Sequence, residues 1–298
     1  AQLRQRGLEM IEEGYKVLSV IGVAGATETG SLDPLDELAD LAEELGAHFH
    51  VDAAWGGATL FSKVYRKLLK GIERADSVTI DAHKQFYVPM GAGAVIFRDP
   101  TLLSSIEHHA EYIIRKGSKD IGSHTLEGSR PGMALLVHAG LHIIGREGYE
   151  MLIDLSMDKA RYFARKIQEA EDFELVVKPE LNILGYRYVP AWVQDVLQTS
   201  TDEALIRAIN IQLDMLTKQM QKAQRAAGKT FVSRTRVEVM RYYSAPISVF
   251  RVVLANPLST CEVLENVLTE QLAIAGNKRG TVILARIRKL VEEAKISG

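Results

Sequence analysis

The sequence predicts an α/β fold, in which a partial large domain with a mostly parallel sheet precedes a smaller α+β domain. Strand-like segments at 15–23, 48–52 and 77–81 alternate with helical patterns in the first half of the 298-residue chain. Such alternation is typical of βαβ units with right-handed crossovers. Segment 15–23 is apolar on both faces, as a strand buried between helix layers should be. Because the pattern changes near residue 150, we expect two domains, 1–148 and 149–298.

Composition narrows the class of protein. The chain is 47% hydrophobic and 25% charged, with a formal net charge of −2, which is ordinary globular composition with no basic surplus to attract nucleic acid. Its single cysteine, Cys261, excludes an internal disulfide and fits a reducing compartment. No apolar run reaches membrane-spanning length and no signal peptide opens the chain, so we expect a cytoplasmic protein. Because the chain begins with Ala1 inside a helical pattern, we expect it to be a piece of a longer protein.

Helix signals in the first half are local and specific. In segment 31–46, Asp33 can cap the helix, Pro34 suits the first turn, and Gly46 ends the apolar pattern. The other elements expected in this half are a helix at 1–14, a helix at 62–71 and a strand at 93–98.

The second half mixes helices with short strands and so predicts an α+β domain. The expected helices are 149–170, 202–226, 260–275 and 281–294, and the expected strands are 182–189, 230–239 and 249–254.

A carboxylate, Asp52, ends the segment 48–52 and is followed by Ala-Ala-Trp-Gly-Gly. A carboxylate at the mouth of a buried strand is costly unless a positive group sits opposite it. The strand expected at 77–81 leads into Asp81-Ala82-His83-Lys84, and Lys84 lies 32 residues after Asp52. Because ligands of open parallel sheets bind outside the carboxyl ends of the strands, we expect Asp52 and Lys84 to face one crevice.

These two segments together resemble the cofactor site of the group II amino-acid decarboxylases, which depend on pyridoxal 5'-phosphate (PLP) and have the aspartate-aminotransferase-type fold (PLP fold type I). Three further segments, in the same order along the chain, are similar to the family. They are 24–33, although Ala26 and Ser31 depart from the family's turn, then 109–112 and 250–257. The chain resembles the C-terminal three-fifths of such an enzyme, and the family's ring-stacking histidine and main phosphate-binding turn lie upstream of the region that Ala1 matches.

The resemblance implies roles for five cofactor-site residues. Lys84 would form a Schiff base with PLP, and Asp52 would pair with the protonated ring nitrogen and keep the ring cationic. Ala54 would lie under the ring, Thr27 near its phenolic oxygen, and His83 against the phosphate. Thr27 could instead only stabilise its turn, and His83 could be a hydrogen-bonded polar core residue.

Two further candidates lie on or after an irregular segment at 106–127. The resemblance implies that Tyr112 is the acid that protonates the substrate carbon after CO2 leaves. Ser129 resembles a serine that reaches the phosphate bound by a neighbouring subunit. An ordinary exposed tyrosine and a helix-capping serine before Pro131 are the alternatives.

Arg251 is the candidate residue for binding a carboxylate of the substrate. It lies within an apolar segment, where an arginine is expensive to bury without an anion, and guanidinium suits bidentate carboxylate binding. In the acidic-substrate branch of the family the corresponding segment supplies a substrate-binding arginine. A surface-facing arginine on an edge strand is the alternative.

The expected activity is α-decarboxylation of an acidic amino acid, L-glutamate to γ-aminobutyrate or L-aspartate to β-alanine, by a homodimer that uses PLP and no metal. A non-catalytic C-terminal fragment that keeps the fold and dimer surface is one alternative. A decarboxylase for another amino acid such as 2,4-diaminobutyrate, or an aminotransferase of the same fold, is another.

Overall fold

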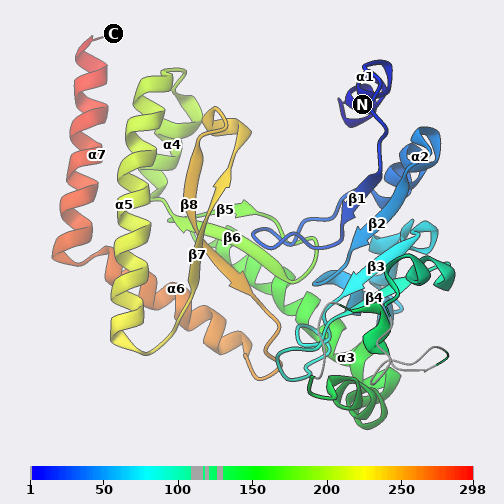
Figure 1. Cartoon of the computed structure of the whole chain (residues 1–298). Helices are drawn as coiled ribbons and strands as arrows, with labels where there is room; N and C mark the ends of the chain where they lie inside the picture. The colour runs from blue at the N-terminus through cyan, green and yellow to red at the C-terminus, as the bar shows by residue number, and fades with distance from the viewer. Residues whose placement is uncertain (1, 109–116, 118–120, 126–129, 298) are drawn as a thin grey trace. The chain divides into compact units, whose positions relative to one another are not determined.

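The computed structural model describes residues 2–108, 117, 121–125 and 130–297, and these fall into two compact units (Figure 1). The first unit comprises Ala1–Gly25 and Leu32–Ile153, and the second comprises Ala26–Ser31 and Asp154–Gly298. The elements of the first unit are α1 (Gln2–Glu12), β1 (Ser19–Val23), α2 (Leu35–Leu45), β2 (His48–Asp52), β3 (Ser77–Ile80), β4 (Ala94–Phe97) and the first part of α3 (Met133–Glu169).

The sheet of the first unit has the order β1-β2-β3-β4. Strands β1, β2 and β3 are parallel, as the sequence predicts, whereas β4 runs antiparallel to β3. In the parallel register Asp52 is the partner of Thr79. The carboxyl ends of β2 and β3 therefore lie side by side, which positions the residues that follow them.

Helix α2 covers one face of this sheet. Its buried side chains Leu35, Leu38 and Leu41 form one core cluster with residues of β1 and β2, including Phe49 and Val51. Apolar residues at this spacing lie on one helix face, which explains why α2 is well signalled in the sequence.

At the two ends of α2 the sequence signals have different outcomes, because the signal at the C-terminal end is confirmed and the one at the N-terminal end is not. Gly46 ends the helix in the left-handed conformation with φ 61°, as predicted. The prediction that Asp33 caps the helix is wrong, because its carboxylate accepts a hydrogen bond from the backbone N–H of Val23 at 2.8 Å and the N-cap is Pro34.

The predicted helix at 62–71 is also wrong. Short 3₁₀ turns occupy this region, at Gly56–Phe61, Arg66–Leu69 and Ile72–Arg74. Gly71, with φ 99°, passes directly against the first turn of α2, so the chain must turn there. Two further 3₁₀ turns, Pro100–Ile106 and Ile121–His124, follow β4.

The second unit is built on an antiparallel sheet of order β5-β6-β8-β7 (Figure 1). Its strands are β5 (Phe173–Val177), β6 (Ile183–Tyr188), β7 (Ser233–Glu238) and β8 (Pro246–Val253), and its helices after α3 are α4 (Ala191–Thr199), α5 (Glu203–Ala227), α6 (Cys261–Ala275) and α7 (Lys278–Ser297). The predicted α+β character of this half is confirmed, and β5 and α4 are added to the predicted elements.

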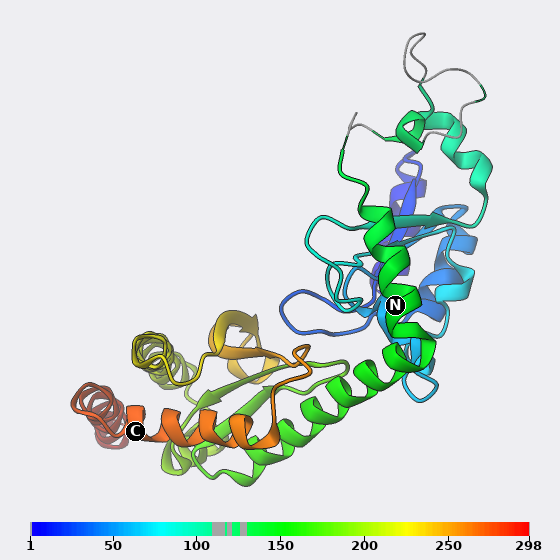
Figure 2. The same ribbon diagram turned by 90° about the horizontal axis from the view of Figure 1, so that it is seen from below.

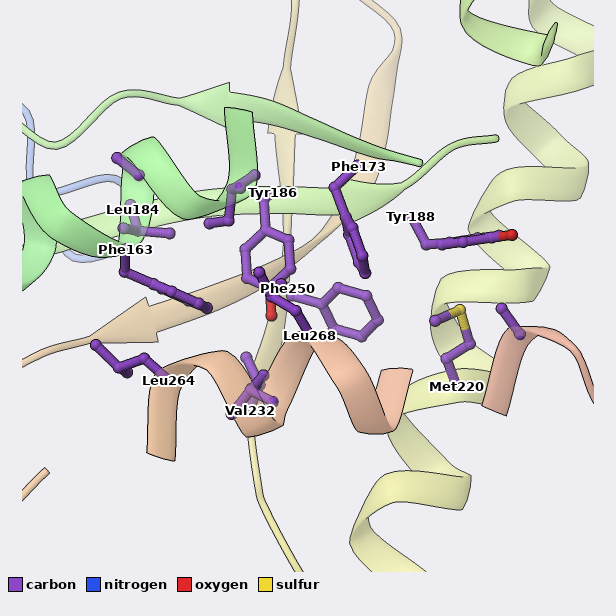
Figure 3. Packing of buried hydrophobic residues seen from close by; sticks show 14 of the residues in the cluster. Phe163, Phe173, Leu184, Tyr186, Tyr188, Met220, Val232, Phe250, Leu264 and Leu268 are labelled. Atoms are coloured by element: carbon purple, nitrogen blue, oxygen red, sulfur yellow. The ribbon is translucent and has the colours of Figure 1, made fainter. Parts of the chain in front are cut away.

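Two core clusters hold the second unit together. In the first, α6 lies beside the C-terminal part of α3 (Figure 2), and both helices pack on β6 and β8. Figure 3 shows its aromatic centre, where the Tyr186 ring lies within 5.9 Å of the rings of Phe163, Phe173 and Phe250. The second cluster joins α4, α5 and α7 to the sheet.

Helix α3 is longer than predicted and is broken at Gly145, whose φ of 68° is not helical. It runs through residues 148 and 149, so the predicted domain limits stay a prediction. Segment 26–31, which follows β1 in the chain, belongs to the second unit. There the Cα of Gly30 lies so close to Ile183 that a Cβ would come within 2.8 Å of that side chain.

Candidate cofactor site

Asp52 ends β2 with its carboxylate exposed. Its Oδ1 accepts a hydrogen bond from the backbone N–H of Ala54 at 3.0 Å, which orients the carboxylate. Among the residues that the structure describes, none donates a hydrogen bond to its Oδ2. One carboxylate oxygen is therefore available to a positively charged N–H from outside the protein.

The segment that carries Lys84 is attached to the end of β2. The backbone N–H of Ala53 donates to Thr79 at 3.0 Å, and that of Asp81 donates to Ala54 at 3.3 Å. The chain then turns, with Lys84 N–H donating to the carbonyl of Asp81 at 3.1 Å. The structure thus brings the Asp52 and Lys84 segments together in the first unit.

Asp81 is a charged neighbour of Lys84 that the sequence reasoning missed. Its Oδ2 lies 2.8 Å from the Lys84 Nζ, and both side chains are partly buried. This contact fixes the position of the amine. The spacing of three residues between an acid and the lysine, directly after a strand, was the signal available in the sequence.

His83 is held by the loop before β4. Its Nδ1 lies 2.9 Å from the carbonyl oxygen of Ala92, so Nδ1 carries a proton and donates. The Nε2 lies 4.0 Å from Asp81. His83 can therefore donate to a phosphate through Nε2 only as the imidazolium.

Two more residues next to Lys84 support the turn. The buried Gln85 donates from Nε2 to the carbonyl of Trp55 at 2.8 Å, which ties the lysine segment to the residues after Asp52. Tyr87 adopts a left-handed backbone conformation with φ 58°, and burial raises the pKa of its phenol. Strained backbone of this kind clusters at functional sites. In the sequence, a glutamine between Lys84 and the apolar residues 86–88 was only a weak signal.

In the second unit the structure brings Thr27 and Arg251 together. The Arg251 guanidinium donates to the carbonyl of Thr27, with Nε at 2.9 Å. Burial lowers the pKa of Arg251, and the charge of Glu28 opposes that effect. Arg251 is thus half-buried on β8 with a carbonyl as its partner, and its predicted contact with a substrate carboxylate stays a prediction.

The other two predicted site residues, Tyr112 and Ser129, lie outside the described residues. Within the described ranges, no group of three or more histidine, cysteine or acidic side chains is arranged to hold a metal ion. No helix in those ranges has the length and apolarity needed to cross a bilayer.

Residues 1–189 match the family model described as the pyridoxal-dependent decarboxylase conserved domain. The chain belongs to this family. Its cofactor is accordingly pyridoxal 5'-phosphate.

Individual members of the pyridoxal-dependent decarboxylases narrow the comparison. The chain is 63% identical over 265 residues to an aspartate 1-decarboxylase of Aliivibrio fischeri. The matched region covers 89% of this chain and 48% of that protein. It is 31% identical to an L-2,4-diaminobutyrate decarboxylase of Acinetobacter baumannii, over 65% of this chain and 40% of that one. The crystal structure of mouse CSAD superposes with a TM-score of 0.79 at 28% identity, covering 91% of this chain and 55% of that one. The chain spans about half the length of the curated relatives it matches.

The residues at the ends of β2 and β3 fit this cofactor. A protonated pyridine nitrogen needs an anionic acceptor, which the second carboxylate oxygen of Asp52 could supply, and an aldehyde needs an amine, which Lys84 could supply. Ala54 is a small residue close to Asp52, which suits the predicted position beside a flat ring.

Proposed function

We propose that this chain carries the lysine-bearing part of a PLP-dependent decarboxylase that converts L-aspartate to β-alanine. The observation that carries the chemistry is the attachment of the Lys84 turn to the end of β2, next to the outward carboxylate of Asp52. The substrate is supported by the 63% identity to an aspartate 1-decarboxylase.

The residues divide the work as follows. When bound, the cofactor accepts the electron pair left as CO2 departs. The carboxylate of Asp52 would pair with the protonated ring nitrogen, and this pairing would keep the ring able to accept electrons. Lys84 provides the amine, and Asp81 fixes its position. We assign His83 to the phosphate, Tyr112 to the proton returned to the substrate carbon, and Arg251 to the carboxylate that distinguishes acidic substrates. Thr27 and Ser129 complete the proposed cofactor contacts.

A trapping experiment tests the assignment of Lys84. The full-length protein is incubated with PLP and reduced with borohydride. Mass spectrometry should then find one cofactor covalently attached to the peptide that contains Lys84. The variant Lys84→Ala should lose this label, whereas Lys67→Ala, at an exposed lysine of a 3₁₀ turn, should keep it. Label at another lysine in the unmodified protein would refute the assignment.

A second assay tests the substrate. CO2 release should be fastest from aspartate and slower from glutamate, cysteine sulfinate and 2,4-diaminobutyrate. One methylene is worth about 1–3 kcal/mol of discrimination in such a site, so glutamate should react about 10- to 200-fold more slowly. A preference for 2,4-diaminobutyrate would overturn the acidic-substrate proposal and leave the cofactor assignment standing.

We also propose that the enzyme is a cytoplasmic homodimer. The part of α3 before Gly145 exposes large apolar side chains, with Leu135 71% and Ile143 83% exposed, and such a surface suits a self-complementary contact. Cys261 is a free, exposed thiol, which fits a reducing compartment. In sedimentation, Leu135→Glu should shift the protein toward monomer, while Ile211→Glu on the exposed face of α5 should not. An unchanged sedimentation coefficient in both variants would contradict this interface.

A further inference from the structure

The lysine turn, residues 81–88, depends on one peptide group, the one that joins Phe86 to Tyr87. Its N–H, which belongs to Tyr87, donates to the carbonyl of Lys84 at 3.2 Å. Its carbonyl, which belongs to Phe86, accepts a hydrogen bond from the Tyr149 hydroxyl at 3.0 Å. Because a trans peptide group is planar, its N–H and C=O point in opposite directions and can only rotate together. The Tyr149 hydroxyl therefore fixes the direction of the N–H that donates to Lys84.

The backbone at this peptide group is in a strained conformation. Tyr87 has φ 58°, in the left-handed region, which residues with a Cβ rarely adopt. Rotation of the Phe86–Tyr87 peptide would relieve this strain, but it would also take the Tyr87 N–H away from the Lys84 carbonyl. Such conformations persist only where the surroundings determine them. The hydrogen bond from Tyr149 is a contact that opposes this rotation.

Tyr149 is itself held in place by close packing. The residue is fully buried, and its ring centroid lies 5.2 Å from that of Phe61 and 5.4 Å from that of Phe86. The rings of Phe61 and Phe86 also lie 5.4 Å apart, so the three rings form one cluster. Burial raises the pKa of the Tyr149 phenol, so the hydroxyl keeps the proton that it donates. The donor to the Phe86 carbonyl thus has a fixed position.

The break in α3 brings this hydroxyl to the lysine turn. Gly140 and Tyr149 lie nine residues apart, about two and a half turns, so they would point to opposite faces of an unbroken helix. The non-helical Gly145 lies between them. As a result, a Cβ on Gly140 would come within 3.1 Å of the Tyr149 hydroxyl oxygen and 3.6 Å of the Val88 side chain. Both parts of α3 on either side of the break therefore contact the end of the lysine turn, within the first unit.

We infer that Tyr149 is a positioning residue for Lys84, because its hydroxyl fixes the peptide group whose N–H holds the Lys84 backbone. Lys84 then has two restraints. Asp81, 2.8 Å from Nζ, fixes the ammonium group, and Tyr149 fixes the backbone through the Phe86–Tyr87 peptide. The catalytic meaning of this restraint, an amine presented to the cofactor in one direction, rests on the proposed function.

Hydrogen exchange of the backbone tests this inference without cofactor or substrate. In the full-length protein freed of PLP, mass spectrometry with fragmentation to single residues measures the exchange rates of the N–H groups of Tyr87 and Ala53. The N–H of Ala53 donates to Thr79 at 3.0 Å and is the internal reference. Tyr149→Phe keeps the ring and removes the hydroxyl. The ratio of the Tyr87 rate to the Ala53 rate should rise about tenfold, the factor that one hydrogen bond contributes.

Two further variants separate positioning from packing. Phe61→Leu is the matched control, because it loosens the same three-ring cluster and leaves the Tyr149 hydroxyl in place, so it should leave the ratio unchanged. Gly140→Ala places a methyl group 3.1 Å from the hydroxyl oxygen and should push it away from the Phe86 carbonyl. This variant should raise the ratio, which keeps the test valid should Tyr149→Phe fail to fold.

The rate at which PLP attaches to Lys84 is the second readout. When the reaction is stopped with borohydride at successive times, Lys84 should be labelled about tenfold more slowly in Tyr149→Phe and at the parent rate in Phe61→Leu. An exchange ratio that does not rise in Tyr149→Phe, or rises equally in Phe61→Leu, would overturn the inference, as would an unchanged labelling rate in Tyr149→Phe. A parent protein without label at Lys84 would instead refute the proposed function and leave the exchange result standing.

Discussion

At Asp52 the effect of losing the negative charge can be measured separately from the effect of changing the shape of the side chain. Its carboxylate is oriented by the N–H of Ala54 and directs one oxygen outward. Asp52→Asn preserves that shape and removes the anion. A charge-assisted hydrogen bond contributes about 1.5–3 kcal/mol, so turnover by the loaded enzyme should fall about tenfold or more. Asp40→Asn, at an exposed carboxylate of α2, is the control, and turnover of Asp52→Asn within twofold of the parent would refute the role.

A second charged residue, Glu174, supports a buried network in the other unit. Its carboxylate accepts from Arg187 at 2.8 Å and from the Tyr242 hydroxyl at 2.9 Å, and it also pairs with Arg241. Arg187 is fully buried and donates to Asn210 at 2.7 Å.

Removing the charge of Glu174 should be costly, because it leaves the Arg187 cation buried without an anion. Glu174→Gln should lower the free energy of unfolding by about 3–5 kcal/mol in urea titrations. Arg241→Gln should cost less than about 1 kcal/mol, because that side chain is about half exposed. Equal losses in the two variants would contradict this account.

The sequence predicts some of these residues and misses others for a physical reason. Asp52 and Lys84 stand out because charged residues directly after strands break an apolar pattern. Asp81 and Gln85 act through contacts with Lys84 and Trp55 that depend on how the chain turns after β3. The Gln85–Trp55 contact follows from tertiary structure, which residue spacing does not contain, whereas the three-residue spacing of Asp81 and Lys84 was a local signal that the sequence reasoning did not use.

Among the elements, two glycines with left-handed backbone allow a matched comparison. Gly46 has φ 61° and open space where a methyl group would stand, whereas a Cβ on Gly71 would lie 2.3 Å from the backbone nitrogen of Asp36. Alanine in the left-handed region costs about 1–2 kcal/mol by itself. Gly46→Ala should show only that loss.

Gly71→Ala should be much more destabilising, because the collision is with backbone at the start of α2 rather than with a side chain that can move. We expect a loss of unfolding free energy at least about 2 kcal/mol larger than that of Gly46→Ala, measured by chemical denaturation of both variants under the same conditions. Similar stabilities would show that α2 shifts easily at its first turn.

The same contact explains why some elements are predicted and others are not. The pattern of apolar residues in α2 and the polar alternation in β2 specify these elements locally. The segment 62–71 has helix-compatible residues, but its path is set by the approach of Gly71 to Asp36. Likewise Asp33 is a residue type that commonly caps helices, but its carboxylate accepts a hydrogen bond from the backbone N–H of Val23 instead.

For the whole molecule, buried tyrosines set a limit to stability in alkali. Burial raises the pKa of Tyr188 to about 12, from an ordinary value of 10.0, and burial also raises the pKa of Tyr186. Their contribution to stability is complete below pH 10, where both states hold the phenol proton. It is lost as the pH rises toward 12, because the unfolded chain releases protons that the folded chain keeps.

The free energy of unfolding should therefore fall between pH 10 and 12 by about 1.4 kcal/mol per pH unit for each such tyrosine. Tyr188→Phe should remove one such contribution to the slope, as measured by urea titrations at several pH values. Phe substitution of the exposed Tyr15 is the control and should leave the slope unchanged.

The membership of segment 26–31 in the second unit has a consequence for the order of synthesis. These residues leave the ribosome more than 150 residues before Ile183 and more than 200 before Arg251, the side chains that Gly30 and Thr27 contact. During translation the connection between β1 and α2 cannot make these contacts until residues 183 and 251 have been synthesised. The sheet of the first unit can form before then. Completion of the second unit therefore depends on a segment made long before the rest of that unit, and a nascent chain arrested before β8 should leave segment 26–31 open to proteases.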